Sequence, residues 1–102
     1  MTTSTEIDGR SVFRRSPDVV CRQVGQESIL VPIRNNVGNL DFVYTLSPVA
    51  ARIWQLIDGV RTADEIVEAI CVEYDVERET ATADFLTLTA DLAEVSLITK
   101  VS

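Results

Sequence analysis

The side chains that most often carry enzyme chemistry are scarce in this sequence. It contains no histidine, and its only two thiols are Cys21 and Cys71. Without histidine, neither a Ser/His/Asp nor a Cys/His nucleophilic arrangement can form. The two isolated thiols lack the paired spacing of a zinc site, and a disulfide between them is not expected in a cytosolic protein. The sequence therefore predicts no catalytic residue, no metal site and no cofactor.

Carboxylates are abundant, but their placement favours helix stabilisation over acid–base catalysis. Five of them fall on predicted solvent-facing surfaces or near helix starts, where a negative charge interacts favourably with the helix dipole: Glu65, Glu68, Asp84, Asp91 and Glu94. Acid–base catalysis would need one of them activated by an orienting partner, and none is predicted. The four glycines are scattered among turns and form no phosphate-binding loop. We expect a protein that is not an enzyme and that acts through a surface.

The net charge of −7 is unevenly distributed along the chain. Up to residue 46, five arginines stand against five acidic residues, whereas from residue 47 onward four basic residues stand against eleven acidic ones. A protein that reads nucleic acid needs a basic face for its phosphate contacts. Because the acidic excess falls on the half predicted to be helical, binding to DNA is not expected.

The 102 residues are enough for one domain with a single modest core. No apolar run approaches the ~20 residues of a transmembrane helix, and the N-terminus lacks the apolar stretch of a secretory signal. Arg14 and Arg15 are followed by Ser-Pro-Asp and not by a hydrophobic segment, which argues against a twin-arginine signal. We therefore expect a cytoplasmic protein that does not associate with membranes.

Two helices with clear end signals are predicted in the middle of the chain. Ser47 is expected to cap the first, with Pro48 at its first helical position, and Gly59 is expected to end it in a left-handed conformation. Thr62 and Glu65 have the spacing of a capping box, which marks the start of the second helix. Because so few residues link the two helices, they must turn sharply on one another, as in a helix-turn-helix.

A third helix is predicted from about residue 78 to residue 95, and it carries two apolar stripes. At 3.6 residues per turn, the first forms one line along the helix: Ala81, Phe85, Leu88, Leu92 and Val95. The second lies roughly 100–150° away and consists of Leu86, Ala90 and Ala93, with Leu97 as a further candidate. Either this second stripe packs on the domain's own strands, or it forms a shallow groove for another molecule.

Three short strands are predicted ahead of the helices, at residues 19–24, 27–31 and 41–46. Their short connections favour an antiparallel meander, in which the third strand has one neighbour and one free edge. Residues 1–16 are rich in Ser and Thr and are predicted to be a disordered tail, so the folded domain is expected to span residues 17–102. Residues 97–101 either add a last strand or close the core.

Residues 58–66 have the pattern Asp-Gly-x-Arg-Thr-x-x-Glu-Ile, preceded by Leu-Ser-x-x-Ala-x-x-Ile-Trp-x-Leu-Ile at residues 46–57. Together with the features above, these motifs resemble the PqqD family, the peptide-binding chaperones called RiPP recognition elements, and residues 58–66 are the most specific match. Further matches follow at Tyr74, Val76, Asp84, Leu86, Leu92, Leu97 and Ile98. The resemblance covers about residues 17–101. Ser47 and Ser96 replace the Asn and Gly that are frequent in the family, but both suit capping and turn positions.

The resemblance implies an α+β fold, a three-stranded antiparallel sheet followed by three helices in a winged helix-turn-helix-like arrangement. It also implies that the protein holds the leader of a ribosomally made precursor peptide and presents it to a modifying enzyme, which in pyrroloquinoline quinone (PQQ) synthesis is a radical SAM protein. The leader would dock as an extra strand beside the third strand and against the third helix. The implied peptide-binding residues are Phe42, Val43, Tyr44, Thr45 and Leu46 of the strand and Leu86, Ala90 and Ala93 of the helix.

Two other functions stay open on the sequence alone. A winged-helix DNA-binding protein shares the predicted topology, and salt-dependent binding to random duplex would support it. A dimerisation module would pair the free strand edge with a second copy of the chain and would need no peptide ligand. A tight homodimer that no peptide displaces would support that function.

Overall fold

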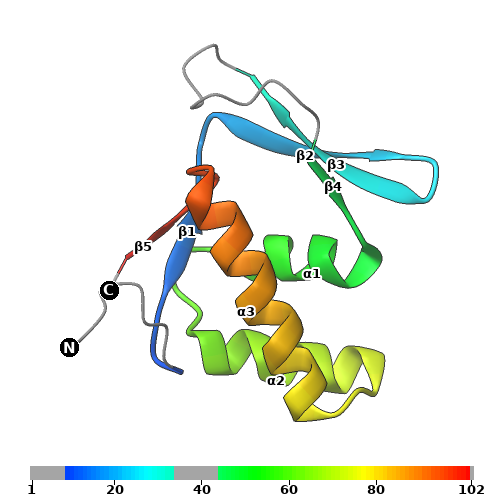
Figure 1. Ribbon diagram of the computed structural model, residues 1–102, viewed down its shortest axis with the longest axis vertical. Coiled ribbons are helices and arrows are strands. Elements are labelled where there is room, and N and C mark those ends of the chain that lie inside the picture. Colours follow the sequence, from blue (N-terminus) through cyan, green and yellow to red (C-terminus); the bar gives the residue numbers. More distant parts are fainter. Residues whose placement is uncertain (1–8, 34–43, 102) are drawn as a thin grey trace.

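The computed structural model describes residues 9–33 and 44–101. In these ranges the elements follow one another as β1 (Phe13–Arg15), β2 (Val19–Val24), β3 (Glu27–Pro32), β4 (Tyr44–Leu46), α1 (Pro48–Leu56), α2 (Ala63–Tyr74), α3 (Arg78–Glu94) and β5 (Ile98–Lys100). Figure 1 shows the sheet of β2, β3 and β4 at one end of the helices, and a separate two-stranded sheet of β1 and β5 beside α3. The predicted α+β fold is confirmed, and the two-stranded sheet is an addition to it.

The three-stranded sheet is an antiparallel meander, as the short connections predict. The turn between β2 and β3 contains Gly25 with a positive φ of 63°, a conformation that glycine adopts without steric cost. β3 pairs with β4 from Ser28 opposite Leu46 to Leu30 opposite Tyr44. Val19, Leu30 and Leu46 are buried and form the sheet's part of the core. Residues 41–43 of the predicted third strand lie outside the described residues.

The helices begin where their capping residues predict. The Ser47 hydroxyl accepts a hydrogen bond from the Ala50 N–H at 3.1 Å. The capping box of α2 is complete, because the Thr62 hydroxyl accepts from the Glu65 N–H while the Glu65 carboxylate accepts from the Thr62 N–H. Gly59 in the short link has the expected positive φ, at 82°, but it does not end the helix as predicted, because α1 ends at Leu56 with Ile57 as its C-cap. This sharp turn fixes α1 against α2, and α1 carries the chain directly away from β4.

The predicted disordered tail at residues 1–16 is wrong for residues 9–16. β1 pairs with β5, and the Phe13 ring is only 3% exposed and meets the Phe85 ring edge to face, with 6.2 Å between the ring centroids. The backbone carbonyls of Gly9 and Ser11 accept hydrogen bonds from the first N–H groups of α2, which have no partner within the helix. The folded domain therefore begins before residue 17. Residues 1–8 lie outside the described residues.

The core forms where α1, α2 and α3 meet the two sheets. The core-facing line predicted for α3 is correct for Ala81, Phe85, Leu88 and Leu92, which are buried. Its last member, Val95, is the C-cap of α3 and is only partly buried against the core. Leu97 and Ile98 are buried as well. Both of the predicted alternatives for residues 97–101 are therefore correct, because β5 is a last strand, and Leu97 just before it and Ile98 within it close the core.

Candidate functional site

The backbone pairing of the three-stranded sheet identifies which groups of β4 are free. In an antiparallel pair, opposite residues alternate between those that exchange hydrogen bonds and those that do not. The Ile33 N–H donates to the Asp18 carbonyl at 2.8 Å, in register with the β2–β3 pairs. Ile33 therefore directs its backbone groups toward β2, and so does every second residue before it in β3, namely Val31, Ile29 and Glu27. Ser28 and Leu30 therefore direct theirs toward β4.

Thr45 of β4 consequently points its backbone N–H and C=O away from the sheet. Its neighbours Tyr44 and Leu46 lie opposite Leu30 and Ser28 and use their backbone groups for pairing with β3. Thr45 lies opposite Ile29, whose groups serve β2. In the part of the chain that the structure describes, no strand pairs with this side of β4. An extended peptide could therefore add to the sheet here.

A groove of about 270 Å³ lies where α1, directly after β4, faces α3. Its α1 wall consists of Ser47, Val49, Ala50 and Ile53. Its α3 wall consists of Asp84, Thr87, Leu88 and Asp91. Ile53 and Leu88 are buried, at 1% and 9% exposure, and form an apolar floor, whereas the two carboxylates are exposed at the rim.

Electrostatics place this flank of α3 beside β4. Burial raises the pKa of the half-buried Tyr44 phenol above its ordinary value of 10.0, and the negative charge of Asp91 raises it further. A carboxylate shifts the pKa of another group in this way only when the two are close. The Asp91 carboxylate at the rim of the groove therefore lies near the Tyr44 side chain of β4.

The pKa of the Tyr44 phenol can be used to test whether Asp91 lies near β4. We expect Asp91→Asn to lower its pKa, because the charge that disfavours the phenolate is removed, but not to 10.0, because burial remains. Absorbance titration in a Tyr74→Phe background, which leaves one of the two tyrosines, would measure it. Asp84→Asn is the matched control and should leave this pKa unchanged. An unchanged pKa in Asp91→Asn would show that Asp91 does not face β4.

The structure does not bring the second apolar stripe of α3 together with β4. Leu86 is 40% exposed and borders a different hollow, which Ala63 and Val67 of α2 also line. Along a helix that turns 100° per residue, Leu86, Ala90 and Ala93 lie about 100–160° around from Asp91. Ala90 and Ala93 are exposed too, so the stripe does not pack into the core. That these three residues contact a peptide remains a prediction. Phe42 and Val43 lie outside the described residues.

The sequence reasoning missed the α3 wall of the groove because it assigned Asp84 and Asp91 to a solvated face. The signal was present in their spacing. Residues 84, 87, 88 and 91 share one side of the helix, and Leu88 also belongs to the core-facing line. Nothing in that spacing shows that α1 and β4 lie opposite this side.

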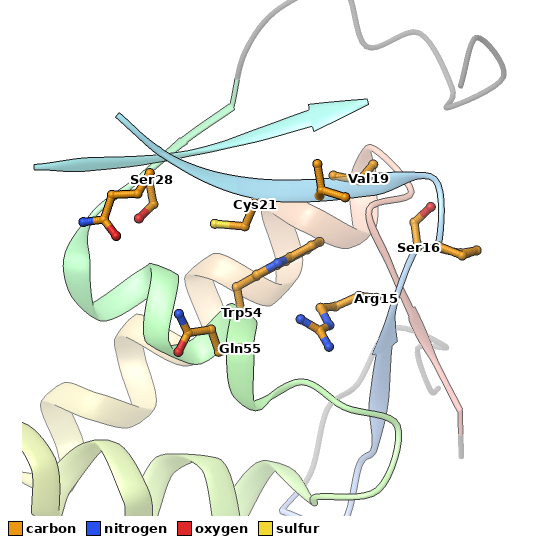
Figure 2. Close-up of a pocket in the computed structure, with 10 residues that line it drawn as sticks. Arg15, Ser16, Val19, Cys21, Ser28, Trp54 and Gln55 are labelled. Atoms are coloured by element: carbon orange, nitrogen blue, oxygen red, sulfur yellow. The ribbon is translucent and has the colours of Figure 1, made fainter. Parts of the chain in front are cut away.

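A larger hollow of about 540 Å³ lies beneath β2. Figure 2 shows Val19 and Cys21 of β2 above Trp54 and Gln55 of α1, with Arg15 at one side. The guanidinium carbon of Arg15 is 5.9 Å from the centroid of the Trp54 ring, within the range of a cation–π contact. Arg15 is the only charged group among the described residues that line this hollow, which therefore offers no acid–base pair.

Neither a metal site nor a membrane span emerges from residues 9–33 and 44–101. No group of three or more His, Cys, Asp or Glu side chains in these ranges could hold a metal ion. No described helix is both long and apolar enough to cross a bilayer. What the described surface offers is a strand edge and grooves, which are features of binding.

Comparisons with known proteins agree with this description. Residues 27–98 match the family described as coenzyme PQQ synthesis protein D (PqqD). Among solved structures, TbiB1 in complex with the TbiA(beta) leader peptide is 30% identical and has a TM-score of 0.66, with 83% of this chain and 93% of that chain covered. The solution NMR structure of the PqqD truncation of Methylobacterium extorquens PqqCD, a stand-alone RiPP recognition element, is 23% identical and has a TM-score of 0.74, with 93% and 96% covered.

No curated protein sequence matches the chain. The family match nevertheless spans more than half of the chain and includes both the sheet edge at β4 and the facing helix α3. The resemblance found in the sequence is therefore confirmed, and the chain belongs to the PqqD family.

Proposed function

We propose that this protein is a peptide-binding adaptor that captures the leader of a ribosomally made precursor peptide and presents it to a modifying enzyme. The leader adds as a strand to the free edge of β4. The enzyme is of the radical SAM type if the pathway follows PQQ synthesis. The encounter takes place in the cytoplasm, where ribosomal peptides are made. The adaptor contributes recognition and no catalytic group of its own.

The observation that carries this proposal is the outward backbone of Thr45. Its N–H and C=O have no strand partner in the described part of the chain. Backbone hydrogen bonds of this kind give a strand-adding peptide its affinity, and neighbouring pockets give selectivity. TbiB1, which is 30% identical to this chain, was solved with a leader peptide, and that supports a peptide ligand here.

The groove beside α3 favours the β4 edge over the β2 edge. The hollow beneath β2 has four polar side chains among its lining: Arg15, Ser16, Gln23 and Gln55. The groove beside α3 has an apolar floor, formed by Ile53 and Leu88, into which one side chain of an added strand can insert. We therefore propose Tyr44, Thr45 and Leu46 as peptide-binding residues, with Phe42 and Val43, which precede β4 in the sequence, as further candidates. Leu86, Ala90 and Ala93 form the alternative flank of α3.

The proposal is tested with the full chain and a library of random peptides about 10 residues long, the length of a long strand. Peptides that the immobilised protein enriches are titrated into the isotope-labelled protein, and amide chemical shifts are followed by NMR. We expect the largest shifts at residues 44–46 and at Thr87 and Asp91. Shifts at Leu86 and Ala93 instead would favour the alternative flank.

Two outcomes would contradict the proposal. If no peptide of the library binds the protein, the proposal that its ligand is a peptide is wrong. Shifts confined to β2 and Trp54 would move the site to the other sheet edge. Sedimentation of the same samples checks the dimerisation alternative, which predicts a tight dimer that the peptides do not dissociate.

A further inference from the structure

The groove beside α3 has a charged rim as well as an apolar floor. Asp84 and Asp91 are seven residues apart on α3, which separates them by about 10.5 Å along the helix axis. Leu88 and Thr87 lie between them and line the same groove. An added strand that runs along α3 would therefore pass an acidic, an apolar and a second acidic position in succession.

No basic side chain in the described residues neutralises these two carboxylates. The three arginines of the helical half are paired with other acids: Arg52 with Glu73, Arg61 with Asp58, and Arg78 with Asp64 and Glu68. Neither Asp84 nor Asp91 forms an ion pair with any residue in the ranges 9–33 and 44–101. Their charge is therefore available to a ligand in the groove.

We propose that the peptide recognised at β4 is cationic on the side that faces α3, with the pattern Lys/Arg–x–apolar–x–Lys/Arg. This inference rests on the proposed function and names the class of leader that the site selects. Residues i and i+4 of a strand lie on one face and are about 13 Å apart. Flexible Lys and Arg side chains bridge the small difference between this spacing and that of the carboxylates. Residue i+2 then inserts its apolar side chain between Ala50 and Leu88.

Charge complementarity of this kind acts on selectivity more than on raw affinity. Ion pairs at an exposed rim contribute about 0.2–1 kcal/mol each, which for two pairs corresponds to a roughly 2- to 30-fold change in affinity. They also speed up association, and salt screens them, with a Debye length of about 8 Å at physiological ionic strength. A leader that lacks basic residues would still bind through its backbone, but more weakly.

The test repeats the random-peptide selection on the wild-type protein and on the double variant Asp84→Asn/Asp91→Asn. The wild type is expected to enrich peptides with the proposed spacing of Lys or Arg, and the double variant is expected to enrich peptides without it. Individual wild-type peptides should bind the double variant roughly 2- to 30-fold more weakly at low salt, and the difference should shrink as salt is raised.

The matched control is Asp75→Asn/Glu79→Gln, which removes the same charge from exposed positions outside the groove. It should keep the wild-type preference. A selection that yields peptides without a basic preference, or the same preference in both double variants, would overturn this inference while leaving peptide binding at β4 intact. A selection that yields no peptide at all would instead contradict the proposed function, peptide binding itself.

Discussion

Phe13→Ala is expected to lower the free energy of unfolding by about 3–5 kcal/mol, the usual cost of removing a buried aromatic ring. The Phe13 ring is 3% exposed and lies edge to face against Phe85. Its loss leaves a cavity between β1 and α3 and weakens the pairing of β1 with β5. Because small domains are stable by only about 5–15 kcal/mol, this change removes a large fraction of the total. Urea unfolding followed by far-UV circular dichroism measures it.

Arg14→Ala is the matched control for Phe13→Ala. Arg14 is the next residue of β1 but is exposed, so its truncation should change stability by no more than about 0.5 kcal/mol. A Phe13→Ala variant that unfolds at the same urea concentration as the wild type would show that β1 is not part of the folded domain in solution. Deletion of residues 1–16 should then be harmless too, whereas we expect it to destabilise at least as much as Phe13→Ala.

The contrast between α2 and β1 shows which elements the sequence could predict. The start of α2 is encoded locally, because the side chains of Thr62 and Glu65 each accept a hydrogen bond from the other residue's backbone N–H within four residues. β1 has three residues, and its partner β5 lies at the other end of the chain. Its single buried aromatic, Phe13, stands in a Ser- and Thr-rich segment that resembles a disordered tail by composition. Only tertiary packing shows that this strand belongs to the fold.

The candidate site was predictable to a similar extent. A meander leaves its last strand with a free edge, so β4 follows from the order of the strands. Hydrophobic periodicity does not show which flank of α3 lies near β4, because it favours Leu86 over Asp84 and Asp91 as a binding residue. That flank depends on how α1 packs against α3 after the turn at Ser47. Amphipathic patterns identify the buried side of a helix but do not distinguish its two remaining sides.

Thr45→Pro is expected to weaken peptide binding at the β4 edge by about 5- to 150-fold, the equivalent of the 1–3 kcal/mol lost when a hydrogen-bond partner is left unsatisfied. Proline has no N–H, and its ring occupies the space that an added strand needs. The fold should tolerate the change, because the N–H of Thr45 points away from β3 and proline is accepted on edge strands in this orientation. Titration of library-selected peptides, followed by fluorescence anisotropy, measures the affinity.

Thr45→Val separates the backbone contribution from that of the side chain. Valine keeps the N–H and the β-branched shape but removes the hydroxyl, so this variant should bind peptides as the wild type does. Equal binding by Thr45→Pro and Thr45→Val would mean that the peptide does not pair with β4, even if the groove still contacts it. A strong loss in Thr45→Pro alone, with an unchanged urea midpoint, is the result that strand addition requires, because Thr45→Val shows that loss of the hydroxyl is not the cause and proline alters the backbone at the free edge.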